Sequence, residues 1–147
     1  MNEIKFRIWD TVLKEWWTKG STLWQIFEDI QEDTLFKEIS WKILKDRIVF
    51  LQYSGLKDKN GKEIYEGDII KFYDDLFIVK FDEYGGEESG WGDDIIKFVG
   101  FYLEPIDVNN LAYYSSIYSL INSWHDIRGN VIGNIYENKE LLEVKNV

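Results

Sequence analysis

The sequence predicts a mainly β fold with minor α content: a small barrel-like or strongly bent antiparallel sheet with one or two short helices. Two observations lead to this prediction. Short segments alternate between apolar and polar residues, and turns rich in Gly, Asn and Asp separate them at close intervals. The 147 residues match one ordinary domain, so residues 1–147 are predicted to fold as a single domain. If the chain is divided, the seam falls near residue 46, between an irregular N-terminal part and a β-rich, barrel-like part.

The first elements are a predicted hairpin and a segment of ambiguous pattern. In residues 4–9 large apolar side chains recur at every second position, which is typical of a half-buried strand. Asp10 and Thr11 are predicted to form a turn, residues 12–18 return as the partner strand, and residues 19–21 break it. The next segment, residues 22–41, fits one face of a helix loosely and fits a strand in part, so both interpretations stay open.

A second group of strands is predicted in the middle of the chain. Residues 48–53 are apolar on both faces, as in a central strand. Asn60 and Gly61 are typical of a type I′ turn, because both residues tolerate a positive φ. A further hairpin joins residues 69–73 to residues 76–81 through a tight turn at Asp74 and Asp75.

The last third of the sequence mixes a loop, strands and a helix. Glycines and acidic residues in 85–92 predict a flexible loop around Trp91. Residues 95–102 are predicted to form a strand, and residues 109–124 carry apolar side chains at helical spacing. Residues 130–136 are predicted to form the final strand, before a C-terminal turn or short helix.

Composition limits the classes of function and the cellular location. The formal net charge is −10 and the isoelectric point is about 4.6, which disfavours binding to the phosphate backbone of nucleic acid. The chain has no cysteine, which fits a reducing cytosol, and neither a signal peptide nor a membrane-spanning run of apolar residues is evident. A cytoplasmic protein without membrane contact is therefore expected.

Three segments together resemble a known family. They are Glu3–Asp10, Gln52–Ile69 and Val131–Asn138, the last followed by Glu140, Leu141 and Leu142. This combination resembles the YopX family of small proteins carried by phages and prophages of low-GC Gram-positive bacteria. Two positions depart from the pattern: Ser54 stands where Thr is usual, and Lys139 stands where Pro is usual.

The resemblance implies a mainly β fold with a barrel-like rear half, and it is compatible with an oligomer. It implies no reaction, because the family has no established activity, and it supplies no catalytic residues, cofactor or metal ligands. Residues 19–46 and 82–128 match nothing in the pattern, so individual binding specificity is expected there.

Several residues of the matched segments are interpreted as structural. Gly67 permits an unusual backbone conformation before a strand, and Asp68 can accept hydrogen bonds from N–H groups of the turn. The alternative for Asp68 is a carboxylate that faces a ligand. Gly133 permits a bulge, and Asn134 can bridge strands. The predicted structural residues are Gly55, Asn60, Gly61, Gly67, Asp68, Gly133 and Asn134.

Catalytic and metal-binding interpretations find little support in the sequence. Ser123, His125 and Asp126 are too close in the chain to form a catalytic triad, although His125 alone could act as a general base. The acidic loop of residues 82–94 lacks the spacing of a calcium-binding loop, so a solvated loop is preferred over a cation site. A basic partner of this loop is a further alternative.

The aromatic residues suggest an interface. Trp9, Trp24 and Trp41 are predicted to lie in the core. Trp16 and Trp17 are consecutive residues of a strand and point to opposite faces, so one of them should face solvent or another subunit. Together with Trp91, in a polar loop, they are the candidate interface residues.

We therefore expect a non-enzymatic phage accessory protein that assembles with itself and binds a host or phage protein. Its acidic surface could imitate nucleic acid. The alternative is a small-barrel protein that binds nucleic acid through Lys57, Lys59 and Lys62, together with Tyr53 or Tyr65. A metal-assisted hydrolase is the third and least favoured class.

Overall fold

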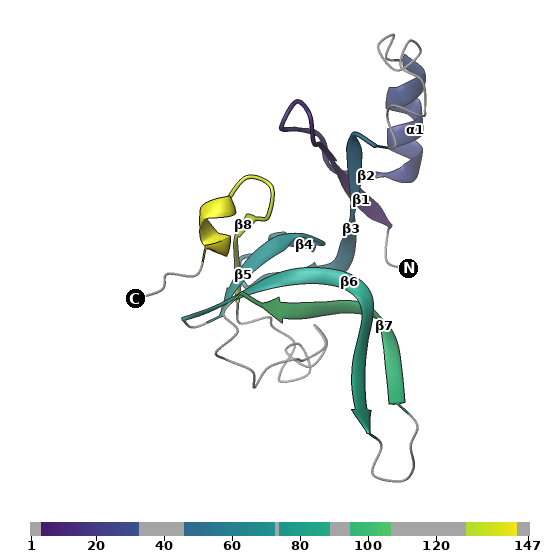
Figure 1. Ribbon diagram of the computed structural model, residues 1–147. Helices are drawn as coiled ribbons and strands as arrows, with labels where there is room; N and C mark the ends of the chain where they lie inside the picture. Colours follow the sequence, from purple (N-terminus) through teal and green to yellow (C-terminus); the bar gives the residue numbers. More distant parts are fainter. Residues whose placement is uncertain (1–3, 33–45, 73, 89–94, 107–128, 144–147) are drawn as a thin grey trace. The chain divides into compact units, whose positions relative to one another are not determined.

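The structure is a computed structural model that describes residues 4–32, 46–72, 74–88, 95–106 and 129–143. The chain is divided between Leu56 and Lys57 into two compact units. Figure 1 shows that strands dominate both units. The mainly β prediction is therefore confirmed, whereas folding as the single domain 1–147 stays a prediction.

The first unit contains an antiparallel arrangement of three strands in the order β2-β1-β3 and one helix. Its elements are β1 (Lys5–Asp10), β2 (Glu15–Thr22), α1 (Leu23–Glu32) and β3 (Ile48–Lys57). The side chains of Ile8, Trp9 and Leu51, and of Ile26 from α1, are almost completely buried. The apolar alternation correctly predicted a strand here but not its buried face: Ile8 is buried, Ile4 is 60 % exposed, and Trp9, on the other face, is buried as well.

The predicted break at residues 19–21 is wrong, because β2 continues to Thr22. The pairing register of β1 and β2 explains how the strand continues past Gly20. Phe6 pairs with Ser21 and Arg7 pairs with Lys19, so Gly20 is an extra residue in the ladder. Its φ of 131° is accessible mainly to glycine, and this allows a bulge where the sequence suggested an interruption.

The ambiguity after residue 22 is resolved in favour of a helix for residues 23–32. Thr22 caps the helix: its Oγ1 accepts a hydrogen bond from the N–H of Gln25, and Gln25 Oε1 accepts one from the N–H of Thr22. Trp24 was predicted to be in the core, but 71 % of it is exposed and its indole N–H donates to Glu28. The reason is helical geometry, since Trp24 lies about 200° around the helix from the buried Ile26.

The second unit contains an antiparallel sheet of four strands in the order β7-β6-β5-β8. Its elements are β4 (Glu63–Tyr65), β5 (Asp68–Phe72), β6 (Asp75–Glu88), β7 (Ile95–Pro105), β8 (Asn130–Asn134) and a short 3-10 helix (Lys139–Leu142). The buried side chains come from all five strands and include Ile64, Tyr65, Ile69, Ile70, Phe77, Val79, Phe101, Leu103 and Val131.

Two predictions for this region need correction. The described strands form open antiparallel sheets, so a closed small barrel is not confirmed, although β6 and β7 bend sharply along their length (Figure 1). The loop predicted from residue 85 is wrong for its first residues, because β6 continues through Gly85 and Gly86 to Glu88. Pairing with β7 along this stretch supplies the hydrogen bonds that the glycine-rich sequence did not indicate. The helix predicted at residues 109–124 lies outside the described residues.

No helix in the described part of the chain is both long enough and apolar enough to cross a membrane.

Candidate functional site

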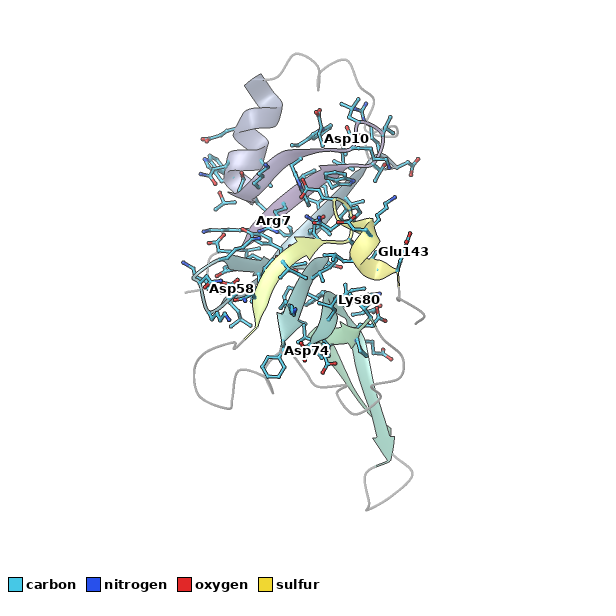
Figure 2. The ribbon with its side chains drawn as sticks, turned by 90° about the vertical axis from the view of Figure 1, so that its left-hand side faces the viewer. Arg7, Asp10, Asp58, Asp74, Lys80 and Glu143 are labelled. Carbon is cyan, nitrogen blue, oxygen red and sulfur yellow. The ribbon has the colours of Figure 1, made fainter. Side chains whose placement is uncertain are left out.

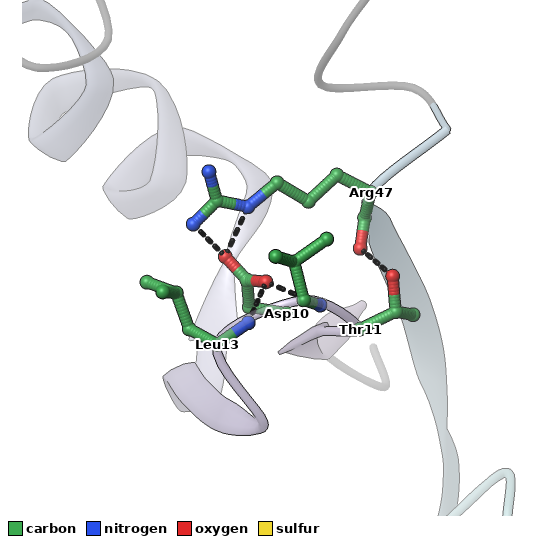
Figure 3. Close-up of polar contacts among 5 residues, drawn as sticks. Asp10, Thr11, Leu13 and Arg47 are labelled. Carbon is green, nitrogen blue, oxygen red and sulfur yellow. Dashed lines mark hydrogen bonds and ion pairs between the residues drawn. The ribbon is translucent and has the colours of Figure 1, made fainter.

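The turn between β1 and β2 is fixed by one buried carboxylate. Asp10 is completely buried, and its Oδ1 accepts hydrogen bonds from the N–H groups of Val12 and Leu13 at 2.8 and 2.7 Å. Its Oδ2 accepts a hydrogen bond from Arg47 Nε at 2.6 Å and forms an ion pair with the same guanidinium (Figure 3). Oδ1 thus holds the turn and Oδ2 holds Arg47, so the carboxylate connects the turn to the start of β3.

Further contacts fix the same turn. The N–H and the hydroxyl of Thr11 both donate to the carbonyl oxygen of Arg47, at 2.8 and 2.7 Å. The N–H of Lys14 donates to the carbonyl oxygen of Asp10, and Lys14 has a φ of 60°. The turn of residues 11–14 is therefore held from both sides, in one conformation that includes a left-handed residue.

The charge of Asp10 is stabilised by these contacts. Burial raises the pKa of the carboxyl, but hydrogen bonds from Arg47 and from the N–H groups of Leu13 and Val12 outweigh burial and hold the pKa below its ordinary value of 3.8. Asp10 is thus ionised at neutral pH, and both of its oxygens act as acceptors.

This fixed turn presents apolar side chains to solvent. Val12 is 66 % exposed and Leu13 is 53 % exposed. The Asp10 carboxylate and the Thr11 hydroxyl hold the backbone, whereas Val12 and Leu13 face solvent together with Lys14. Two adjacent exposed apolar side chains on a fixed turn are suited to binding another protein.

The candidate interface tryptophans pack within the first unit. Trp16 lies edge-to-face against Trp9, with ring centroids 4.8 Å apart. The guanidinium of Arg47 lies 6.0 Å from the ring centroid of Trp17. Both Trp16 and Trp17 are half-buried. Trp91 lies outside the described residues, and the interface role of all three stays a prediction.

A second buried carboxylate organises the turn after Lys57. Asp58 Oδ1 accepts hydrogen bonds from the N–H groups of Asn60 and Lys62, at 2.8 and 2.9 Å. Its Oδ2 accepts one from the N–H of Val131 in β8, at 3.0 Å. Figure 2 shows Asp58 beside β8. One side chain therefore connects two segments that are 73 residues apart.

The pKa of Asp58 is lowered for the same kind of reason as that of Asp10. Burial raises the pKa of Asp58, but hydrogen bonds from Val131, Lys62 and Asn60, together with the charge of Lys62, lower it below the ordinary value of 3.8. The side chain of Asn60 adds a hydrogen bond to Asn130, at 3.0 Å.

The type I′ turn predicted at residues 60–61 is wrong. Among the described residues other than glycine, only Lys14 has a positive φ, so Asn60 does not adopt the conformation that this turn requires. Gly61 alone is left-handed, with a φ of 80°, and its N–H donates to the carbonyl of Asp58. The Asp58 carboxylate supports a different turn, in which only one residue must be left-handed.

Gly61 offers a test of this turn that is free of packing effects, because nothing lies within 4 Å of an added Cβ. Gly61→Ala should therefore lower the free energy of unfolding by about 1 kcal/mol, through backbone strain alone. Gly61→Asn should cost less, since Asn tolerates the left-handed region better. Urea unfolding followed by circular dichroism measures both variants, and an equal loss in the two would contradict the proposed cause.

The remaining predicted structural residues lie at strand ends and bulges. Gly67 has a φ of 78°, and Asp68 Oδ2 accepts a hydrogen bond from the N–H of Tyr65 at 2.9 Å. Gly133 adjoins a bulge in β8, and an added Cβ there would collide with the side chain of Asn138. Gly55, in β3, has a φ of 84°.

Asn134 holds the turn that follows β8 rather than a second strand. Its Oδ1 accepts hydrogen bonds from the N–H groups of Tyr136 and Glu137, both at 2.9 Å, and its Nδ2 donates to Glu137. The structural residues of the second unit thus serve turns and bulges around one sheet.

The other candidate residues from the sequence form no site within the part of the chain that the structure describes. Ser123, His125 and Asp126 lie outside the described residues. Among the side chains that the structure describes, no three or more His, Asp or Glu residues are arranged to hold a metal ion. Tyr65 is completely buried and cannot stack on a base, which removes one predicted nucleic-acid contact. Lys57, Lys59 and Lys62 are exposed, and Tyr53 is half-buried.

Comparison with known proteins identifies the family. A family model described as YopX protein matches residues 5–143. The chain belongs to the YopX family. The structure is also similar to the crystal structure of protein EF1440 from Enterococcus faecalis, with 26 % sequence identity and a TM-score of 0.55, covering 97 % of this chain and 100 % of that one. A search of the curated proteins gives no match. Neither family nor structural neighbour carries a description of an activity.

Sequence reasoning missed the two residues that organise the turns. The role of Asp58 could have been recognised from the local sequence, because an aspartate two residues before Asn60 can accept a hydrogen bond from the N–H group of Asn60. Asp10 was recognised only as part of a turn. No sequence pattern indicates that Arg47 would be its partner, since the two residues are 37 positions apart.

Proposed function

We propose that this YopX-family protein is a non-enzymatic, self-associating protein-binding module, and that it serves as an accessory protein of a phage or prophage in the host cytoplasm. The observation that carries this proposal is the fixed turn of residues 11–14 with its exposed Val12 and Leu13. A surface that is already rigid loses little conformational entropy on binding, so its apolar contacts contribute more fully to affinity.

Other exposed apolar residues of the first unit support a binding role. Besides Val12 and Leu13, its large exposed apolar side chains are Ile4, Leu23, Trp24 and Phe50. Trp24 stands out, because tryptophan is enriched among residues that dominate binding energy. The family membership supports a phage or prophage origin, and the absence of cysteine is compatible with the cytoplasm.

The non-enzymatic character is supported by how the two buried carboxylates are used. Asp10 and Asp58 both have a pKa below the ordinary value and use their oxygens to accept backbone hydrogen bonds. A general acid or base works best with a pKa near the operating pH. These two groups are shifted in the opposite direction, which suits a structural role.

Self-association can be tested by size-exclusion chromatography with light scattering. We expect a defined oligomer for the natural protein. The double substitution Val12→Ser, Leu13→Ser should weaken association about tenfold or more, because each buried aliphatic side chain contributes roughly 1.5–3 kcal/mol. Ile132→Ser, at an exposed position in the second unit, is the matched control and should leave the oligomer unchanged.

A monomeric natural protein, or an oligomer that the double substitution leaves intact, would refute this assignment of the turn. Circular dichroism should show that the variants remain folded. An added oligonucleotide that shifts the elution volume, with the shift lost in salt, would favour the nucleic-acid alternative instead.

A further inference from the structure

The sheet of the second unit has two edges that differ in how they are protected. At one edge, β8 contains only five residues and has a register shift opposite Ile69 and Ile70. The N–H of Val131 is occupied by the carboxylate of Asp58. A short strand, a bulge and an occupied N–H group are features that prevent another strand from adding to an edge.

The other edge lacks these features over most of its length. β7 contains eleven residues, Ile95–Pro105, and pairs with β6 on one side. Within the described residues, no strand pairs with its other side. Pro105 ends the strand, but Phe98–Leu103 is a run of six residues without a charge. Lys97 and Glu104 lie at the two ends of this run. A stretch of edge strand without charges is a template for adding a strand.

An apolar row leads from the core out along this edge. Val79 pairs with Leu103, and both are buried; Phe81 pairs with Phe101, with ring centroids 4.9 Å apart. Directly opposite residues share a face, so the row continues to Val99, which is 74 % exposed. Phe81 is already 40 % exposed.

Beyond the residues that pair with β5, β6 and β7 form a two-stranded arm. β5 pairs with residues 75–78 of β6, whereas β7 pairs with β6 from residue 77 to residue 88. Two strands alone are only marginally stable in water, and a third strand would cover the exposed apolar row. Among the described residues, the arm is thus a two-stranded element with an apolar row left exposed.

The charge of the arm indicates the chemistry of the missing strand. Its opposite face carries Asp82, which is exposed, and Glu104, which is 39 % exposed at its side chain and bonded to Lys80. Glu83 is exposed beside Val99. The whole chain has a net charge of −10, so a second copy would place two acidic arms together. A basic segment complements this surface better.

We propose that β7 binds an extended segment of a partner protein as an added strand, and that apolar and basic residues alternate in this segment. Its apolar side chains would cover Val99 and Phe81, and its basic side chains would lie near Asp82 and Glu104. This inference rests on the proposed protein-binding function, but it uses a surface separate from the turn of residues 11–14. It names the class of partner: a polypeptide recognised through its backbone as well as its side chains.

A labelled peptide of alternating Val and Lys, about ten residues long, is a direct probe. Fluorescence anisotropy should show saturable binding to the full chain. N-methylation of alternate residues removes the N–H groups of one peptide edge and leaves charge and composition nearly unchanged. Methylation of one set of alternate residues should weaken binding about tenfold or more, and methylation of the other set should have little effect.

Equal binding of both methylated peptides would overturn the proposal, because simple charge attraction does not distinguish the two edges. Failure of the unmethylated peptide to bind would overturn it as well. Neither result bears on the light-scattering test of the turn, so failure of this inference is distinguishable from failure of the proposed function.

A pair of matched variants locates the binding edge. Val99→Lys places a charge on the exposed apolar row and should weaken peptide binding about tenfold. Ile132→Lys, on the protected edge strand β8, should leave binding unchanged. Equal effects of the two substitutions would contradict the assignment to β7. Loss of the oligomer in Val99→Lys without any peptide binding would identify a second copy as the occupant and overturn the basic partner.

Discussion

Asp58→Ala should lower the free energy of unfolding by about 3 kcal/mol, because it removes the acceptor of three backbone hydrogen bonds, each worth about 1 kcal/mol. The loss should be concentrated where those bonds are. Hydrogen exchange should accelerate most at the N–H groups of Asn60, Lys62 and Val131. Urea unfolding followed by circular dichroism measures the total, and exchange measured by NMR locates it.

Asp58→Asn is the matched control for charge. The amide keeps one oxygen, which can still accept the hydrogen bonds from Asn60 and Lys62, but its nitrogen cannot accept the one from Val131. We expect a loss of about 1 kcal/mol and faster exchange at Val131 alone. If both variants were as stable as the natural protein, the carboxylate would not be the link between the turn and β8.

The same carboxylate makes stability depend on pH. The pKa of Asp58 in the folded state is below the ordinary value of 3.8, so the folded state favours the ionised form. Its contribution is therefore complete above about pH 3.8 and is lost as the pH falls through the folded pKa. Asp58→Asn should lose less stability on acidification than the natural protein. Parallel curves of stability against pH would exclude this contribution.

The elements that the sequence predicted well are those determined by local pattern. Alternation of apolar residues located β1, a run that is apolar on both faces located β3, and apolar residues before a tight turn located β5. The Gly-Asp pair before β5 and the glycine of the bulge in β8 were also visible, because an unusual backbone conformation restricts the residue type.

The errors came from contacts between distant residues. Gly20 and Gly85 were interpreted as interruptions, but pairing with another strand keeps both in extended segments. The barrel-like alternative is not confirmed, since the described strands form open sheets; closure depends on how the first and last strands meet, which no local pattern specifies. The partners of the two carboxylates, Arg47 for Asp10 and Val131 for Asp58, are likewise set by the fold.

Asp10→Ala should lower the free energy of unfolding by about 2 kcal/mol, because the N–H groups of Val12 and Leu13 lose their acceptor. The same substitution leaves Arg47, whose side chain is only 18 % exposed, without its carboxylate partner, which adds to the loss. The effect on self-association should be larger than this loss of stability alone implies. A turn that is no longer fixed must be ordered again each time it binds.

Arg47→Ala separates the two roles of Asp10. It leaves the buried Asp10 carboxylate without its counter-ion, which should lower the free energy of unfolding. The oxygen that holds Val12 and Leu13 remains, so the turn of the folded protein should keep its conformation. We therefore expect Asp10→Ala to weaken the oligomer in light scattering, and Arg47→Ala to weaken it much less. Equal weakening would show that the ion pair, rather than the hydrogen bonds to the backbone, organises this surface. An unchanged oligomer in both variants would mean that self-association does not depend on a fixed turn, and that another exposed surface of the first unit, such as Trp24, carries it.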